Sequence, residues 1–175
     1  MADTTTNRPT AKQMLLPFTL TVAILALDQV TKALVVARLP MNRPVEVLGD
    51  FLRFWYRTNT AVSFSLGSWL PVEVQRYGFL VLSLAVVALV LVYYFRARDL
   101  GPVQRWLLAA IVAGGLGNDI DRVARGSVVD FIDSKFWGIF GMERWPTYNV
   151  ADATVVVAGI LFMVTVIVQE SRSKQ

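Results

Sequence analysis

Two aspartates at the ends of apolar segments are the residues most able to do chemistry in this chain. Asp130 follows a long apolar stretch, and Asp152 stands at the start of the next one. If the first stretch leaves a bilayer and the next re-enters it, both carboxyls return to the same depth at the water–lipid boundary. Ionisable groups at membrane depth are costly and usually functional. Two carboxyls that share a proton can act as general base and general acid, so the pair predicts hydrolysis at a membrane surface.

The lack of Cys and His removes several other kinds of chemistry. With Cys 0 and His 0, the chain has no thiol nucleophile, no disulfide framework, no imidazole base and no Cys/His metal site. Any catalysis must therefore rest on Asp, Glu, Lys, Ser, Thr or Tyr, and we expect no metal and no other cofactor.

A second polar group lies just before the first aspartate. Asn118 and Arg122 are one helical turn apart and share a face, and the Arg fork can hold a carboxylate or a peptide carbonyl. The plainer alternative is an ion pair of Arg122 with Asp119 or Asp121 at the end of a helix. For Asp119 the two interpretations stay equally open, whereas Arg122 together with Asn118 favours function.

Polar residues also occur inside the predicted helices. Asp28 and Lys32 have helical spacing, and the simplest interpretation is an internally neutralised pair that stabilises helix packing. Extension of Lys32 to the outer headgroups fits as well. Asn149 can cap a helix that opens at Val150, with Asp152 in its first turn, where the helix dipole favours negative charge. An Asp in a first turn is common capping chemistry, so the second carboxyl nearby is what points to catalysis.

Four apolar stretches must position these groups. The chain has 175 residues, of which 55% are hydrophobic and 17% charged, and this balance predicts a single integral membrane domain over residues 1–175. A helix needs about 20 apolar residues to cross a bilayer. The stretches that qualify run approximately over 15–36, 77–95, 106–122 and 150–168.

The distribution of Lys and Arg predicts how these stretches face the two sides of the membrane. The basic residues are densest in the short segments next to the two termini and between the second and third stretches, so both termini are expected in the cytoplasm. The net charge of +4 could suggest nucleic acid, but basic residues at the ends of apolar runs suit anionic headgroups better. No nucleic-acid partner is expected.

The opposite side carries the two longer connections. Residues 44–68, approximately, alternate apolar and polar side chains as a short β-sheet does, and the aromatic-rich residues 125–147 could form a short amphipathic lid on the membrane. The expected fold is an all-α membrane protein with four transmembrane helices, a small extracytoplasmic β-sheet and a short interfacial lid helix.

Five blocks follow one another from the first apolar stretch to the fourth: Asp28-Gln29-Val30-Thr31-Lys32, Asn59-Thr60-Ala61-Val62-Ser63-Phe64-Ser65, Gly117-Asn118-Asp119-Ile120-Asp121-Arg122, Val128-Val129-Asp130-Phe131-Ile132 and Asn149-Val150-Ala151-Asp152. In this order they resemble the motifs of the lipoprotein signal peptidases, the type II signal peptidases of bacteria. The resemblance covers all of the chain except its two tails. It departs from the family at Asn59-Thr60-Ala61-Val62-Ser63-Phe64, where Gly and Ala are usual, and at Asp119, where an apolar residue is commoner.

The resemblance implies an aspartic endopeptidase with Asp130 and Asp152 as its catalytic dyad. Residues implied to support the dyad or bind substrate are Asn59, Asn118, Arg122, Asn149, Asp28, Lys32 and Asp121. The implied substrate is a prolipoprotein whose Cys carries diacylglycerol, cleaved just before that Cys. The expected protein is a monomer among the lipids of the bacterial cytoplasmic (inner) membrane, multi-pass, with its active site near the outer leaflet.

Two other classes of protein fit this sequence less well. A small four-helix transporter with a proton relay would need acids near the bilayer midplane and a polar stripe through its spans. Here the second stretch carries no charge and the acids gather at one end. An assembly subunit without chemistry would leave the converging Asp and Asn residues unexplained.

Overall fold

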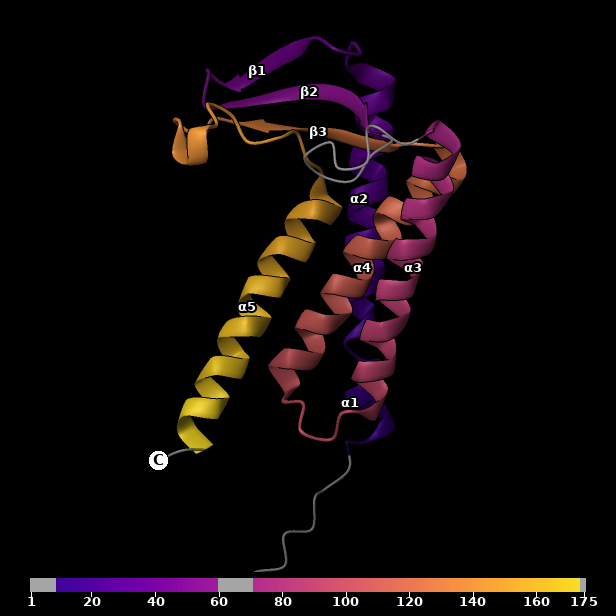
Figure 1. Cartoon of the computed structure of the whole chain (residues 1–175), viewed down its shortest axis with the longest axis vertical. Helices are drawn as coiled ribbons and strands as arrows, with labels where there is room; N and C mark the ends of the chain where they lie inside the picture. The colour runs from indigo at the N-terminus through magenta and orange to yellow at the C-terminus, as the bar shows by residue number, and fades with distance from the viewer. Residues whose placement is uncertain (1–8, 60–70, 174–175) are drawn as a thin grey trace, which may run out of the picture.

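The computed structural model describes residues 9–59 and 71–173. Within these ranges, four long helices run along the length of the molecule, and a small sheet lies across one end of them (Figure 1). The described helices are α1 (Ala11–Leu15), α2 (Phe18–Arg38), α3 (Val72–Arg96), α4 (Pro102–Arg125) and α5 (Val150–Ser173).

Hydropathy separates α4 from the other long helices. In the described residues, three of the four predicted stretches lie in helices long and apolar enough to cross a membrane. The fourth, over 106–122, lies in α4, whose charged and amide residues lower its hydropathy, so its crossing of the membrane stays a prediction. The three candidate spans are Ala11–Arg38, Tyr77–Arg96 and Val150–Ser173.

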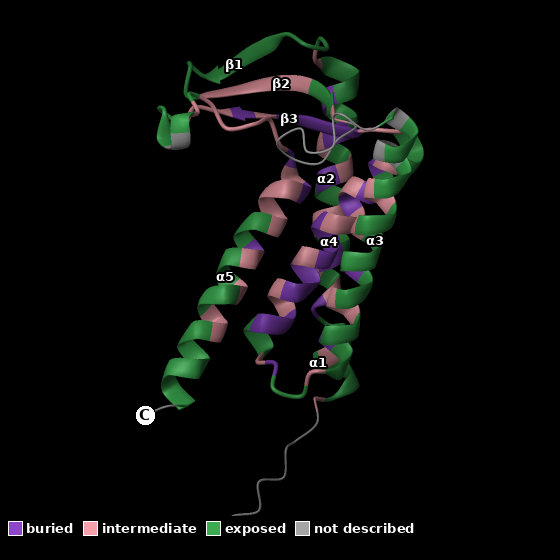
Figure 2. Cartoon of the chain, viewed as in Figure 1, coloured by how far each residue is buried: buried purple, intermediate pink, exposed green. Residues whose placement is uncertain are grey.

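The helix α4 lies at the centre of the bundle. It packs against α2, α3 and α5, and Figure 2 shows many buried residues along it, whereas α3 and α5 are largely exposed. A Cβ at Gly114 would lie 2.5 Å from Cγ2 of Val155 and 2.6 Å from the backbone oxygen of Ala151. A Cβ at Gly117 would lie 2.8 Å from Oδ2 of Asp28. The close approach of α5 and α2 to α4 therefore requires glycine at both positions.

The sheet has the antiparallel strand order β1-β2-β3, with β1 at Pro44–Leu48, β2 at Leu52–Asn59 and β3 at Val128–Ser134. The sequence prediction of a small sheet is thus confirmed for its first two strands. The rest of the predicted β segment, over 60–68, lies outside the described residues.

The connection between α4 and α5 differs from the prediction. A short lid helix was expected within 125–147, but after Arg125, the last residue of α4, this range contains the strand β3 and the single-turn 3-10 helix η2 (Ile139–Gly141). The expectation of a lid helix is therefore wrong. Residues Val128 to Phe131 are all buried, and their backbone groups find partners in β2 and beyond it, since the Val129 N–H donates to Asp121 and the Phe131 N–H to the Tyr148 carbonyl. Burial on both faces hides the period-2 pattern by which an exposed strand is recognised.

Apolar contacts fix the sheet on the helices. Val35 of α2 forms a buried cluster with Val129 and Phe131 of β3. Phe54 of β2 meets Phe131 edge to face, with ring centroids 5.9 Å apart. These contacts hold β3 against the end of α2, close to the start of α5.

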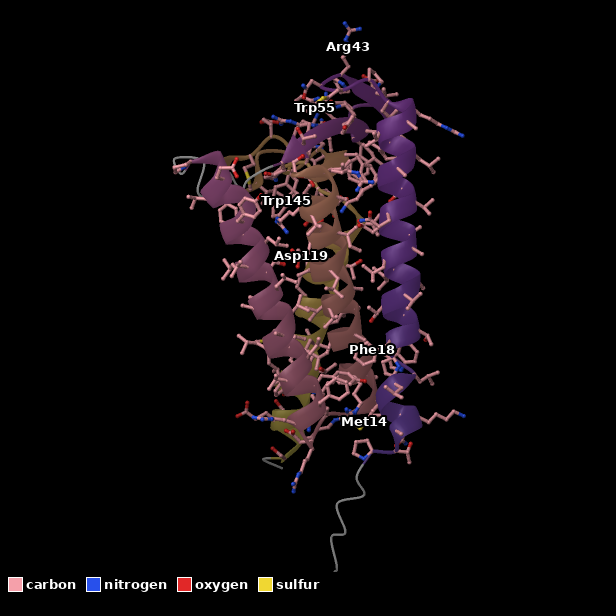
Figure 3. All side chains as sticks on the ribbon, turned by 90° about the vertical axis from the view of Figure 1, so that its right-hand side faces the viewer. Met14, Phe18, Arg43, Trp55, Asp119 and Trp145 are labelled. Atoms are coloured by element: carbon pink, nitrogen blue, oxygen red, sulfur yellow. The ribbon has the colours of Figure 1, made fainter. Side chains whose placement is uncertain are left out.

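A second set of contacts holds the opposite end of the bundle together. Figure 3 shows Met14 and Phe18 at this end and Trp55 at the sheet end. The hydroxyl of Tyr94 donates to the backbone oxygen of Met14 at 2.7 Å, and its ring lies 5.1 Å from that of Phe18. The end of α3 is thereby tied to α1 and to the start of α2.

Candidate active site

Asp130 projects from β3 and is 3% exposed. Strand β2 lies beside it in antiparallel register, with Arg57 opposite Asp130 and Asn59 opposite Val128. This register brings Asn59 to the carboxyl, and its Nδ2 donates to Oδ2 of Asp130 at 3.1 Å. Nδ2 of Asn149 donates to the other oxygen, Oδ1, at 2.9 Å. Both oxygens of Asp130 therefore accept a hydrogen bond from an amide.

Asp152 lies in the first turn of α5, and Asn149 caps that helix as the sequence predicts. The backbone N–H of Asp152 donates to Oδ1 of Asn149 at 2.9 Å. In return, Oδ2 of Asp152 accepts from the backbone N–H of Asn149 at 3.2 Å. This reciprocal pair is a capping box built from Asn and Asp. Because Asn149 also contacts Asp130, one residue holds the two carboxyls next to each other.

Asn118 joins α4 to this pair. Its Nδ2 donates to Oδ1 of Asp152 at 2.8 Å. Its Oδ1 accepts from Nδ2 of Asn149 at 3.1 Å and from Nζ of Lys32 at 2.9 Å. A lysine ammonium has only donors, so Lys32 turns the amide oxygen of Asn118 toward itself and the NH2 group toward Asp152.

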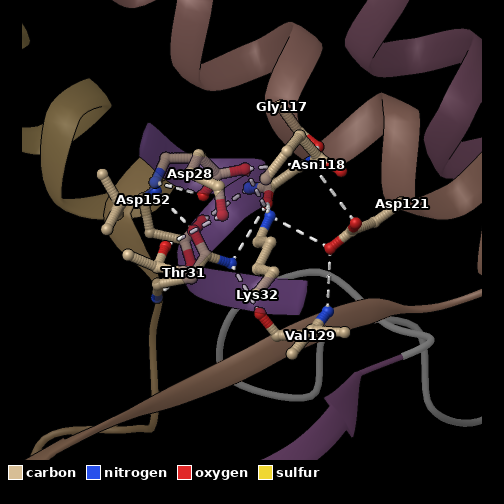
Figure 4. A network of polar contacts seen from close by, with 12 residues as sticks. Asp28, Thr31, Lys32, Gly117, Asn118, Asp121, Val129 and Asp152 are labelled. Carbon is tan, nitrogen blue, oxygen red and sulfur yellow. Dashed lines mark hydrogen bonds and ion pairs between the residues drawn. The ribbon is translucent and has the colours of Figure 1, made fainter. Parts of the chain in front are cut away.

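Lys32 is fully buried at the centre of a polar network (Figure 4). Its Nζ lies 2.9 Å from Oδ2 of Asp28 and 3.0 Å from Oδ2 of Asp121. The predicted Asp28–Lys32 pair is therefore present and includes a second acid. The alternative in which Lys32 extends to the headgroups is wrong, because these carboxylates and Asn118 hold the ammonium inside the bundle.

The two acids of this network also connect separate elements. Oδ1 of Asp28 accepts from the backbone N–H of Ala151 at 3.0 Å, which ties α2 to the start of α5. Oδ2 of Asp121 accepts from the backbone N–H of Val129 at 3.0 Å, which ties α4 to β3. Ala151 is next to Asp152 and Val129 is next to Asp130, so the network fixes the backbone that carries the two aspartates.

A cavity of about 350 Å³ opens beside the two carboxyls. Its polar end contains five of the residues singled out from the sequence, whereas Asp28, Lys32 and Asp121 are not part of the lining and lie behind it. The rest of the wall consists mainly of apolar side chains of α3, α4 and α5. The polar lining residues from the sequence prediction are Asn59, Asn118, Arg122, Asp130 and Asp152.

Burial decides the protonation of Asp130. Loss of solvent raises the pKa of Asp130 to about 7, and the charge of Asp152 adds to the rise, while the hydrogen bonds from Asn59 and Asn149 oppose it. A carboxyl with a pKa near neutrality can give up and take back a proton during turnover. Among the described residues, no group of three or more Asp or Glu side chains has the arrangement of a metal site.

Arg122 forms the ion pair that the sequence left open. Nη1 of Arg122 lies 3.1 Å from Oδ1 of Asp119. The other oxygen of Asp119, Oδ2, accepts from Oγ of Ser83 at 3.0 Å. Three polar partners were missed from the sequence: Ser83, Gln29 and Arg125, which forms an ion pair with Asp121. Gln29 lies within the first motif block and donates to the Gly117 carbonyl at 3.0 Å. Ser83, in contrast, is a single Ser in an apolar helix, and no motif in the sequence points to it.

Comparison with known proteins gives consistent matches. The family described as signal peptidase (SPase) II matches residues 20–168. A lipoprotein signal peptidase of Treponema pallidum (strain Nichols) is 43% identical over 149 residues, which cover 84% of this chain and 80% of that protein. The lipoprotein signal peptidase of Treponema denticola is 40% identical over 165 residues, covering 94% of this chain and 95% of that protein.

Solved structures share the fold. One, described as a bacterial membrane enzyme, superimposes with a TM-score of 0.74 at 23% identity, covering 96% of this chain and 94% of that chain. A second with the same description has a TM-score of 0.74 at 24% identity, covering 91% of this chain and 95% of that chain.

Proposed function

The chain belongs to the signal peptidase II family, and from this premise we propose that it is an aspartic endopeptidase acting on lipidated prolipoproteins. The bond cut is the one just before the Cys that carries diacylglycerol. The observation that carries the proposal is the bridge through Asn149, which donates to Asp130 and to Asp152 beside a partly apolar cavity.

The proposed chemistry follows from two carboxyls that share one proton. The ionised carboxylate takes a proton from water, and the resulting hydroxide attacks the scissile carbonyl carbon. The protonated carboxyl polarises the carbonyl oxygen and then protonates the leaving amine. The peptide C–N bond breaks, and the two products are a free carboxylate on the signal peptide and a free amine on the lipidated Cys.

The surroundings of the two acids support a division of these roles. Asp130 has a pKa of about 7 and is the better proton donor at neutral pH. Asp152 lies at the N-terminus of α5 and accepts from the Asn149 N–H and from Asn118, two hydrogen bonds that favour its ionised form. We therefore assign the general base to Asp152 and the general acid to Asp130 in the first step.

The other polar residues predicted from the sequence are proposed to support this pair. Asn59 and Asn149 orient Asp130, and Asn118 orients Asp152. Lys32, with Asp28 and Asp121 as counter-ions, fixes the Asn118 amide. Arg122 lines the cavity and is proposed to bind the substrate backbone.

The cavity walls suit a substrate that remains in lipid. Apolar side chains of α3, α4 and α5 line the cavity away from the carboxyls, so acyl chains and an apolar signal segment can lie against them while the scissile bond reaches the dyad. In this proposal α4 is a fourth span within one domain, both termini are cytoplasmic, and the dyad lies near the outer leaflet of the bacterial inner membrane. The working unit is a monomer.

The test uses purified protein in detergent with a prolipoprotein peptide whose Cys carries diacylglycerol. We expect a product that begins with the lipidated Cys, identified by mass spectrometry. The same peptide with an unmodified Cys and the Asp130→Asn variant should each give little product. Equal cleavage of both peptides would contradict the proposed substrate, and full activity of Asp130→Asn would contradict the dyad.

A further inference from the structure

Asp119 is a buried acid that the proposed dyad does not use. It is 4% exposed on α4, and Figure 3 shows it between α4 and α3. Its Oδ2 accepts from Oγ of Ser83 on α3 at 3.0 Å, and its Oδ1 accepts from Nη1 of Arg122 at 3.1 Å. Its carboxylate thus connects a helix on one wall of the cavity to an arginine on another.

Arg122 has hydrogen-bonding capacity left for a ligand. Its side chain is 13% exposed and lines the cavity together with Asp130 and Asp152. A guanidinium has five N–H donors. The described part of the chain engages one of its nitrogens, through Asp119. The other donors are available at the end of the cavity where the two carboxyls lie.

The charge balance restricts what this arginine can bind. A buried guanidinium without a counter-ion would attract any anion, including a lipid phosphate. Asp119 lies one turn before Arg122 on the same face of α4 and cancels its charge. A neutralised Arg–Asp pair with free N–H donors favours an uncharged acceptor, such as a peptide carbonyl, over an anionic headgroup.

We propose that Asp119, held by Ser83, is a positioning residue that directs Arg122 toward a backbone carbonyl of the substrate and prevents Arg122 from capturing anionic lipid. The inference rests on the proposed function, since it assigns the peptide next to the scissile bond as the ligand. The two anchors of Asp119 lie on different helices, α3 and α4, so the direction of the guanidinium depends on the packing of these helices.

The experiment measures steady-state cleavage of the lipidated peptide, normalised to folded protein, for Asp119→Asn, Ser83→Ala, Arg122→Gln and the double variant Asp119→Asn/Arg122→Gln. Loss of a charge-assisted hydrogen bond is expected to raise KM about tenfold in Asp119→Asn while kcat changes little. Ser83→Ala should raise KM less, in the same direction. The double variant should be no worse than Arg122→Gln alone, because Asp119 acts only through Arg122.

A second arm tests the exclusion of anions. Mixed micelles with increasing phosphatidylglycerol should raise the KM of Asp119→Asn more than that of the unaltered protein, and Arg122→Gln should remove this difference. A purely structural role would lower the folded fraction without either effect on KM. A wild-type KM in Asp119→Asn, or fully additive effects on KM in the double variant, would overturn this inference and leave the proposed function intact. Absence of cleavage by the unaltered protein would overturn the proposed function, and this inference with it.

Discussion

Nδ2 of Asn149 donates to Oδ1 of Asp130 at 2.9 Å, across 19 positions of the chain. The backbone N–H of the same residue donates to Asp152 as part of the helix cap. A single residue therefore sets the start of α5 and the approach of the two carboxyls. Stability of the cap and geometry of the proposed dyad are coupled in this protein, because neither can change without moving Asn149.

Replacement of either dyad acid should remove activity without unfolding the protein. In Asp130→Asn and Asp152→Asn, the amide keeps size and hydrogen bonding but cannot exchange a proton. General acid–base catalysis contributes about 100- to 10,000-fold, so we expect a loss at least that large in turnover per folded molecule. The matched control is Asp50→Asn, since Asp50 is exposed and its ion pairs are of the weak surface kind. Wild-type turnover in Asp152→Asn would exclude the dyad.

The pH dependence should follow Asp130. Its pKa of about 7 in the folded protein stands above the ordinary 3.8, so the folded state keeps a proton that the unfolded state releases between these values. The contribution of this group to stability is therefore complete at low pH and is lost as pH rises through 7. We expect kcat/KM to fall above about pH 7, as the general acid loses its proton.

A comparison with Asp130→Asn isolates this contribution. The variant has no proton to lose at this position. Its thermal unfolding midpoint should therefore rise relative to that of the unaltered protein as the pH increases from about 5 to about 8. A constant difference between the two midpoints over this range would contradict the raised pKa of Asp130.

Removal of the buried ammonium should cost stability. Lys32→Met leaves Asp28 and Asp121 without their shared cation, and breaking a buried ion pair costs about 3–5 kcal/mol. Asp28→Asn should cost less, because Lys32 keeps Asp121 as a partner and an amide oxygen can still accept from the Ala151 N–H. Thermal unfolding midpoints measured in a single detergent rank the stabilities of the two variants and the unaltered protein. Equal midpoints for Lys32→Met and the unaltered protein would show that the network carries no stability.

The contact of α4 with α5 should be sensitive to a single methyl group. In Gly114→Ala the new Cβ meets the backbone oxygen of Ala151, which cannot turn away. Overpacking of this kind costs about 1–3 kcal/mol, and separation of the helices should also lower turnover by moving Asn118 away from Asp152. The control is Gly159→Ala on α5, where a Cβ meets nothing within 4 Å. Similar effects of the two substitutions would argue against this close approach.

The orientation can be read with reporter fusions. Fusions at Arg98 and Gln175 should report the cytoplasm, and fusions near Gly49 and Gly141 the outer side, because Lys and Arg are densest near the first pair. A cytoplasmic signal near Gly141 would put the sheet, and with it Asp130, on the wrong side for cleavage of an exported substrate.

Features that depend on neighbouring residues could be predicted from the sequence alone. The apolar stretches, the cap at Asn149 and the spacing of Asp28 and Lys32 are local patterns, and each has a counterpart in the structure. The approach of Asp130 to Asp152 was also predicted, because a hairpin of two long helices brings the adjoining ends of the helices together.

Other features required the folded chain. Strand β3 was missed because its pairing partner β2 lies some 70 residues earlier, with Asn59 and Asp130 separated by 71 positions. The second acid beside Lys32, Asp121, and the link from Ser83 to Asp119 depend on which faces of α2, α3 and α4 meet. Sequence spacing determines which residues share a face of one helix, but helix rotation and packing decide which faces touch. The sequence by itself therefore predicted the two carboxyls and their approach to each other, whereas only the tertiary structure decided which side chains orient them.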